Sequence, residues 1–155
     1  MKARYVHTSL VARDWRRLAQ FYIDVFGCVM IPPERDLSGE WLSDATGVPF
    51  ARIRGAHLQL PGYAECGPSL EVFQYNQVID APAPVANRQG LAHLAFEVED
   101  VHATLEEVVS AGGASLGAIV TRTIEGVGVL TFCYCTDPEG NIIELQHWSG
   151  HSASP

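Results

Sequence analysis

The sequence is poor in basic residues and has no long hydrophobic run. Lys and Arg number 10 against 18 Asp and Glu, which gives a formal net charge of −8. Outside Arg13, Arg16 and Arg17, which we interpret as the solvated face of a helix, the basic residues form no cluster, and this argues against nucleic-acid binding. No stretch reaches the roughly 20 apolar residues of a membrane span. The N-terminal stretch also lacks an apolar signal-peptide core, so we expect a cytoplasmic protein that does not act at membranes.

The CxxC spacing typical of thiolate metal sites and redox motifs is also missing. The four cysteines are Cys28, Cys66, Cys133 and Cys135. Cys133 and Cys135 stand two residues apart on one predicted strand, which makes a disulfide between them awkward. In a reducing compartment we therefore predict buried free thiols rather than disulfides or a thiolate metal site.

Two stretches of the chain show the same order of predicted elements. In the first, a β-rich run over Tyr5–Val11 precedes a helix that Asp14 caps and Gly27 ends. The apolar residues of that helix recur at helical spacing: Trp15, Leu18, Phe21, Tyr22, Val25 and Phe26. A short strand, Cys28–Ile31, is predicted to stop at Pro32-Pro33. Two more strands, Ala51–Leu60 and Ser69–Tyr75, complete the first half.

The second half repeats this order. Leu91–Val98 alternates as a strand, and Asp100 caps a helix that Gly112-Gly113 ends. Three strands are predicted to follow: Leu116–Thr123, Val127–Tyr134 and Ile142–His147. The turn before the last strand has the sequence Asp137-Pro138-Glu139-Gly140-Asn141, which is rich in turn residues.

Each half therefore has the order β-α-β-β-β. We predict an α+β fold in which two tandem modules pair into a curved, partly closed sheet. The expected boundaries are residues 1–80 for the first module, a Pro/Ala linker at 81–89, residues 90–148 for the second module and a tail at 149–155. One segment, Pro32–Phe50, has no counterpart in the second half. A short helix, a lid or binding loop, and a plain connector all remain open for it.

Four metal-ligand side chains occupy matching places in the two halves. His7 and His93 lie in the opening strands, and Glu71 and Glu144 lie near the start of the closing strands. Taken singly, a strand His is often a core or edge residue and a strand Glu usually faces solvent. Pairing of the halves about a pseudo-twofold axis would bring all four together. Two imidazoles and two carboxylates form a mixed set suited to a divalent Zn, Ni, Co, Mn or Fe ion, which predicts a metal site at the centre of the fold.

The motifs that hold these residues resemble the vicinal oxygen chelate superfamily, which includes glyoxalase I, extradiol dioxygenases and bleomycin-resistance proteins. The resemblance rests on VHTSLVARDWRRLAQFYIDVFG, GLAHLAFEVEDV and DPEGNIIEL. It implies that His7, Glu71, His93 and Glu144 are the four metal ligands of a glyoxalase I-like site. It also implies that a carboxylate moves a proton next to a substrate carbonyl through an enediolate. Glu144 is the first candidate for this role and Glu71 is the second. We therefore expect a metal-dependent lyase or isomerase that acts on a small molecule, and a homodimer.

Two other functions stay open. An Fe(II) extradiol dioxygenase would use three ligands and a His shortly before Tyr134, but no His occurs between His102 and His147. A non-catalytic protein of the resistance type would typically lack the ligand set. Of the remaining histidines, His57 is a candidate for the cavity, whereas strand alternation turns His147 away from Glu144. Five arginines are available to bind substrate carboxylates, and no motif singles one out: Arg35, Arg52, Arg54, Arg88 and Arg122.

Overall fold

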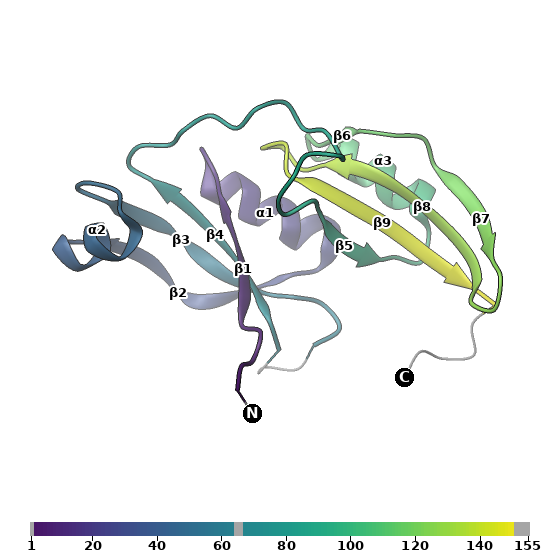
Figure 1. Cartoon of the computed structure of the whole chain (residues 1–155), viewed down its shortest axis with the longest axis horizontal. Helices are drawn as coiled ribbons and strands as arrows, with labels where there is room; N and C mark the ends of the chain where they lie inside the picture. The colour runs from purple at the N-terminus through teal and green to yellow at the C-terminus, as the bar shows by residue number, and fades with distance from the viewer. Residues whose placement is uncertain (1, 64–66, 151–155) are drawn as a thin grey trace. The chain divides into compact units, whose positions relative to one another are not determined.

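The chain folds into two compact units, each with its own mixed β-sheet. The structure is a computed structural model and describes residues 2–63 and 67–150. The units comprise Met1–Asp80 and Ala81–Pro155. In the described residues there are three α-helices and two sheets, and neither sheet closes into a barrel (Figure 1). The predicted α+β class is therefore confirmed. No helix in the described ranges is long and apolar enough to cross a membrane.

The first unit consists of a four-stranded sheet with two helices. Its elements are β1 (His7–Val11), α1 (Trp15–Phe26), β2 (Val29–Ser38), α2 (Glu40–Thr46), β3 (Arg52–Gln59) and β4 (Ser69–Tyr75). The strand order is β1-β4-β3-β2. The opening strand β1 runs parallel to the closing strand β4, whereas the other neighbours are antiparallel. The first and last strands of the unit therefore lie side by side.

Helix α1 covers one face of this sheet. It begins after Asp14, whose side chain accepts a hydrogen bond from the Arg17 N–H, and it ends at Gly27 in the left-handed conformation with φ 69°. The helix buries an apolar stripe against strand residues from the same face: Trp15, Leu18, Phe21 and Tyr22 from α1, and Leu10, Leu58, Leu70 and Val72 from the strands. Because side chains alternate along a strand, the opposite face carries the residues between these.

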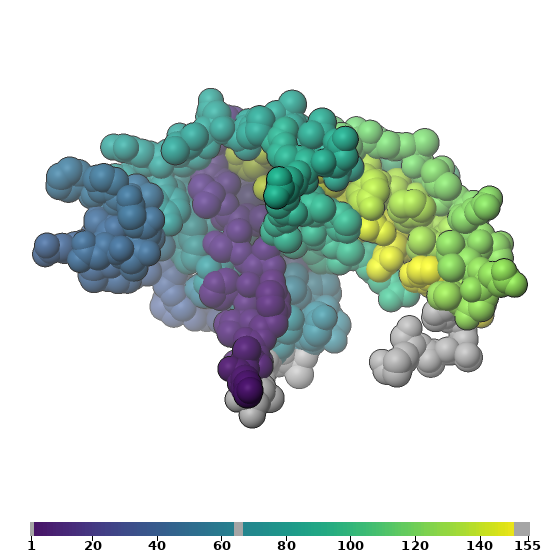
Figure 2. Space-filling view, in the orientation of Figure 1, coloured from purple at the N-terminus to yellow at the C-terminus, as the bar shows by residue number. Residues whose placement is uncertain are grey.

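Helix α2 covers one end of that opposite face. Its Leu42 is buried in a small apolar cluster with Ala51, Ile53 and Phe73. Ile53 and Phe73 belong to the face opposite α1, because they alternate with the residues packed on that helix. In the space-filling view α2 and its flanking turns form the dark blue part of the unit (Figure 2). The segment Pro32–Phe50, left open by the sequence, is thus mainly a strand and a short helix.

The second unit repeats the plan with a five-stranded sheet. Its elements are β5 (Leu94–Glu97), α3 (Val101–Ser110), β6 (Ala114–Ser115), β7 (Val120–Ile124), β8 (Gly128–Thr136) and β9 (Ile142–Ser149). The order is β5-β9-β8-β6, and β7 also pairs with β8. Again the opening strand β5 is parallel to the closing strand β9. Helix α3, capped by Asp100, packs on β8 and β9 over a core that includes Val101, Val108, Cys133, Ile143 and Leu145.

Several predicted element boundaries were wrong. The strand expected to stop at Pro32-Pro33 continues to Ser38, because the two prolines occupy a register shift between Ile31 and Arg35 in the terminal strand of the sheet. A proline there need not donate a hydrogen bond to a neighbour. The opening strand of the second unit is shorter than Leu91–Val98, so that His93 precedes it. The strand expected at Leu116–Thr123 begins at Val120 and is preceded by the short β6.

The predicted free thiols are confirmed for three cysteines. Cys28, Cys133 and Cys135 are buried and free of disulfides. Burial raises the pKa of Cys28 to about 11 and that of Cys135 to about 12. These thiols therefore pack as small apolar side chains beneath α1 and α3. Cys66 lies outside the described residues.

Candidate metal centre

In the first unit, His7 and Glu71 lie together on the sheet face opposite α1. The parallel register pairs His7 with Ser69 and Ser9 with Glu71, so the His and Glu side chains project from neighbouring strands on the same side. The His7 Nδ1 and Glu71 Oε1 atoms are 3.4 Å apart. The Glu71 side chain is 14% exposed, and that of His7 is 42% exposed. This carboxylate is thus largely withdrawn from water beside an imidazole that solvent can reach.

A second histidine faces the same carboxylate from the other side. His57 on β3 is directly opposite Glu71 on β4 in the antiparallel register. Its Nε2 atom lies 3.3 Å from Glu71 Oε1, the oxygen that also faces His7. The His57 ring meets Phe73 edge-on with centroids 5.8 Å apart. Burial lowers the pKa of His57, Glu71 acts in the opposite direction, and the charges of Arg35 and His7 reinforce the lowering.

In the second unit, His93 and Glu144 form the corresponding pair. His93 immediately precedes β5, and Glu144 lies on the parallel strand β9 opposite Ala95. The His93 Nε2 and Glu144 Oε2 atoms are 2.9 Å apart, and these side chains are 30% and 15% exposed. The pairing of parallel neighbours therefore brings a histidine to a carboxylate here as it does in the first unit.

Tyr134 takes the place that His57 has in the first unit. It lies on β8, directly opposite Glu144 in the antiparallel register, as His57 lies opposite Glu71. Its ring centroid is 5.2 Å from that of His93. Burial raises the pKa of Tyr134, and the charge of Glu144 and a hydrogen bond to that carboxylate add to the effect. The phenol therefore stays protonated and donates to Glu144.

The four predicted ligands thus occur as two His–Glu pairs, one in each unit. Two ligand atoms bound at right angles to one ion, at about 2.1 Å each, stand about 3 Å apart. Separations of 3.4 and 2.9 Å in the two pairs are close to that value. In residues 2–63 and 67–150, no group of three or more His, Cys, Asp or Glu side chains is arranged to hold a metal ion. The nitrogen and oxygen donors of each pair fit neighbouring positions around a divalent ion.

Two residues that contact the pairs were not assigned a role by the sequence motifs. His57 was a candidate for the cavity, and Tyr134 belonged to the comparison with dioxygenases, but their positions opposite the two carboxylates depend on strand register. A hydrophobic pattern predicts which residues share a face and does not by itself predict which residue lies opposite which. His147 lies on the face opposite Glu144, as expected, and its Nδ1 atom is 2.9 Å from the Val98 carbonyl oxygen.

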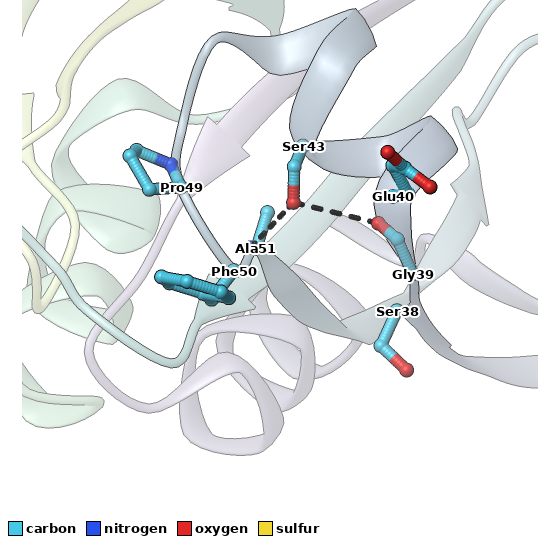
Figure 3. Close-up of a pocket in the computed structure, with 7 residues that line it drawn as sticks. All are labelled: Ser38, Gly39, Glu40, Ser43, Pro49, Phe50 and Ala51. Atoms are coloured by element: carbon cyan, nitrogen blue, oxygen red, sulfur yellow. Dashed lines mark hydrogen bonds between the residues drawn. The ribbon is translucent and has the colours of Figure 1, made fainter.

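A separate pocket of about 570 Å³ lies beside α2, and none of the predicted ligands lines it (Figure 3). Its wall is held by Ser43, whose Oγ accepts from the Ala51 N–H at 3.1 Å and donates to the Gly39 carbonyl oxygen at 3.4 Å. Phe50 forms another part of the wall, is 87% exposed and has a φ of 55°. The pocket contains one ionisable side chain, Glu40, so its chemistry differs from that of the His–Glu pairs.

Comparison with known proteins gives one family. A family model described as Glyoxalase/Bleomycin resistance protein/Dioxygenase superfamily matches residues 4–145. No curated protein sequence matches the chain. Among solved structures, a glyoxalase family protein from Bacillus cereus is 21% identical with a TM-score of 0.79, and 95% of each chain is covered. A glyoxylase/bleomycin resistance protein/dioxygenase domain from Frankia sp. EAN1pec is 22% identical with a TM-score of 0.58, and the match covers 96% of this chain and all of that one. At these identities the structures are evidence for the fold alone.

Proposed function

The chain belongs to the Glyoxalase/Bleomycin resistance protein/Dioxygenase superfamily, and from this premise we propose that it is a metal-dependent lyase or isomerase of the glyoxalase type. The observation that supports this most directly is the presence of a His–Glu pair on the sheet of each unit, with atoms 3.4 and 2.9 Å apart. His7, Glu71, His93 and Glu144 would hold the ion. A divalent ion supplies Lewis acidity toward oxygens of a bound substrate.

Within this proposal Glu144 is the base that takes a proton from the carbon next to a substrate carbonyl. Its side chain is 15% exposed, and its Oε2 atom lies 2.9 Å from His93 Nε2. Tyr134 donates a hydrogen bond to it and so fixes one orientation of the carboxylate. Glu71 is the second candidate for proton transfer, because it lies in the equivalent place between His7 and His57. We also propose that the protein acts as a homodimer on a small molecule.

Metal content provides the first test. Protein purified without chelators should contain about one divalent ion per chain, and His93→Ala should lose most of it. His102→Ala is the matched control, because His102 is exposed on the first turn of α3 and is not one of the proposed ligands. Retention of the metal by the control and its loss from His93→Ala support the site. Wild-type protein that neither contains a divalent ion nor binds one on addition contradicts it.

Proton exchange tests the reaction. The metal-loaded enzyme, incubated in D₂O with hydroxy- and dicarbonyl compounds, should exchange the hydrogen next to the carbonyl, as followed by NMR. Glu144→Gln should lower this exchange by about 100-fold or more, in the range typical of a lost general base. Oxygen consumption with catechols, without such exchange, would instead identify a dioxygenase. Metal binding with neither activity would identify a binding protein.

A further inference from the structure

Arg35 lies on the same sheet face as Glu71 and His57. The register pairs Arg35 with Gly55, two residues from His57 on β3, and His57 in turn lies opposite Glu71. Residues two apart on a strand share a face. The register shift after Ile31 inserts two extra residues into β2, which leaves the face of Arg35 unchanged and places it opposite Gly55. Of the five arginines considered from the sequence, Arg52 and Arg54 alternate to the other face of β3.

The guanidinium of Arg35 has no acidic partner in the part of the chain that the structure describes. It is half-buried and donates a hydrogen bond to the Pro33 carbonyl oxygen. The acidic residues on either side of it in sequence are already paired, Glu34 with Arg16 and Asp36 with Arg52, each with an N–O distance of 2.7 Å. A guanidinium carries five N–H donors, so that most of the hydrogen-bonding capacity of Arg35 is unused within the described residues.

His57 lies on the same face as Arg35, and its Nε2 atom faces Glu71 Oε1 at 3.3 Å. Arg35 lies opposite Gly55, and His57 is two residues further along β3 on the same face, so the two side chains are diagonal neighbours on adjacent strands. The carboxylate closest to His57, Glu71, is 14% exposed and lies between two imidazoles. An arginine with no acidic partner among the described residues, next to a carboxylate that already faces two imidazoles, favours an oxygen anion as its ligand.

We propose that Arg35, with His57 beside it, binds an oxyanionic group of the substrate, a carboxylate or a phosphate. The assignment to a substrate rests on the proposed function, since it places the anion on the face that holds Glu71. Strand β2 is two strand spacings from β4, about 10 Å at the backbone, and an arginine side chain spans part of that gap. The substrate is therefore a small acid whose charged group lies several bonds from the oxygens near Glu71.

A titration with simple anions tests the subsite. The full-length protein is titrated separately with inorganic phosphate and with propionate, and amide shifts of β2 and β3 are followed by NMR. Arg35→Gln should weaken binding of the preferred anion by about ten-fold or more, the effect of a lost hydrogen bond to a charged group. The matched control is Arg54→Gln, which removes the same charge from the neighbouring strand on the other face. The control should bind as the wild type does.

The outcomes separate this inference from the proposed function. Loss of anion binding in Arg35→Gln but not in Arg54→Gln supports the subsite. Tighter binding of propionate or of phosphate then identifies the substrate group as a carboxylate or a phosphate. Equal binding by both variants and the wild type, or no shift with either anion, overturns it. The metal content of each variant is measured in parallel. If all variants retain the metal and Arg35→Gln binds the anion as the wild type does, the subsite alone is refuted. If no metal is found but anion binding still depends on Arg35, the metal-dependent reaction alone is refuted. Circular dichroism confirms that both variants are folded.

Discussion

Gly55→Ala should destabilise the first unit more than an ordinary glycine substitution. Gly55 lies on β3 between Phe73 on β4 and Arg35 on β2. A Cβ atom at this position would stand 2.0 Å from the Val72 carbonyl oxygen and 2.5 Å from Phe73 Cδ1. Ordinary contact needs more than 3 Å, so β3 and β4 would have to separate locally by about 1 Å. Because the nearest atom belongs to the backbone, a change of rotamer cannot relieve the clash.

The magnitude follows from the cost of overpacking. Extra atoms in a packed core usually cost about 1–3 kcal/mol, and a clash with backbone should place Gly55→Ala at about 3 kcal/mol or above. For a chain of this length, 1 kcal/mol corresponds to about 2–4 °C in the melting temperature. We therefore expect a decrease of about 6–12 °C, measured by circular dichroism or calorimetry. Since the Phe73 ring lies 5.8 Å from His57, the candidate site should also be disturbed.

Two further glycines make the measurement specific. A Cβ at Gly117 would meet no atom within 4 Å, so Gly117→Ala should leave the melting temperature nearly unchanged. A Cβ at Gly113 would stand 2.2 Å from the Thr136 carbonyl oxygen, so Gly113→Ala should destabilise the second unit in the same way. A Gly55→Ala protein that melts within about 2 °C of the wild type would refute the close approach of β3 and β4.

The buried thiols and a helix cap give two more predictions. In a Cys66→Ser protein at pH 8, Cys28 and Cys135 should resist a thiol reagent until denaturant is added, since a pKa of about 11 for Cys28 leaves only about one thiol in a thousand ionised; rapid labelling of the native protein would contradict their burial. The pKa of Asp100 is lowered by the backbone N–H of Ala103 and by that of the preceding residue. The cap therefore stabilises the fold above the ordinary carboxyl pKa and loses this effect as the pH falls through the lowered value. Asp100→Ala should accordingly melt below the wild type at pH 7 and approach it below about pH 4, and a difference independent of pH would argue against the charged cap.

The sequence was sufficient for helices α1 and α3 and for the repeat, whereas it left α2 open. Asp14 and Asp100 cap α1 and α3 as predicted, and Gly27 ends α1 in the left-handed conformation. These are local effects, in which a side chain or a glycine acts on backbone groups a few residues away. Hydrophobic periodicity is also a local property of the sequence, and it predicted the order of the main elements in both halves. The α+β class could therefore be predicted before any tertiary contact was known.

The path of β2 could not be predicted in this way. Pro32-Pro33 normally ends a strand, and only the position of β2 at the end of the sheet, with a register shift at the prolines, allows the strand to continue. The strand order is a tertiary property that the local sequence does not contain. The same holds for the position of Arg35, because the shift adds two residues to β2 and so places Arg35 opposite Gly55, near His57, without changing its face.

The two carboxylates have matching surroundings except at one position, and this difference bears on which of them moves a proton. In each unit the opening strand lies parallel to the closing strand, and His7 on β1 and His93 just before β5 each lie beside the glutamate of the closing strand. The residue directly opposite the glutamate is His57 in the first unit and Tyr134 in the second. The Tyr134 hydroxyl donates to the Glu144 carboxylate, and this hydrogen bond orients the carboxylate. An imidazole nitrogen can donate or accept a hydrogen bond, so the contact between His57 and Glu71 does not fix one direction of hydrogen bonding. Under the proposed function, Tyr134 therefore orients Glu144 for the proton transfer assigned to it, whereas the surroundings of Glu71, with His57 and Arg35 on the same face, are better suited to binding the substrate.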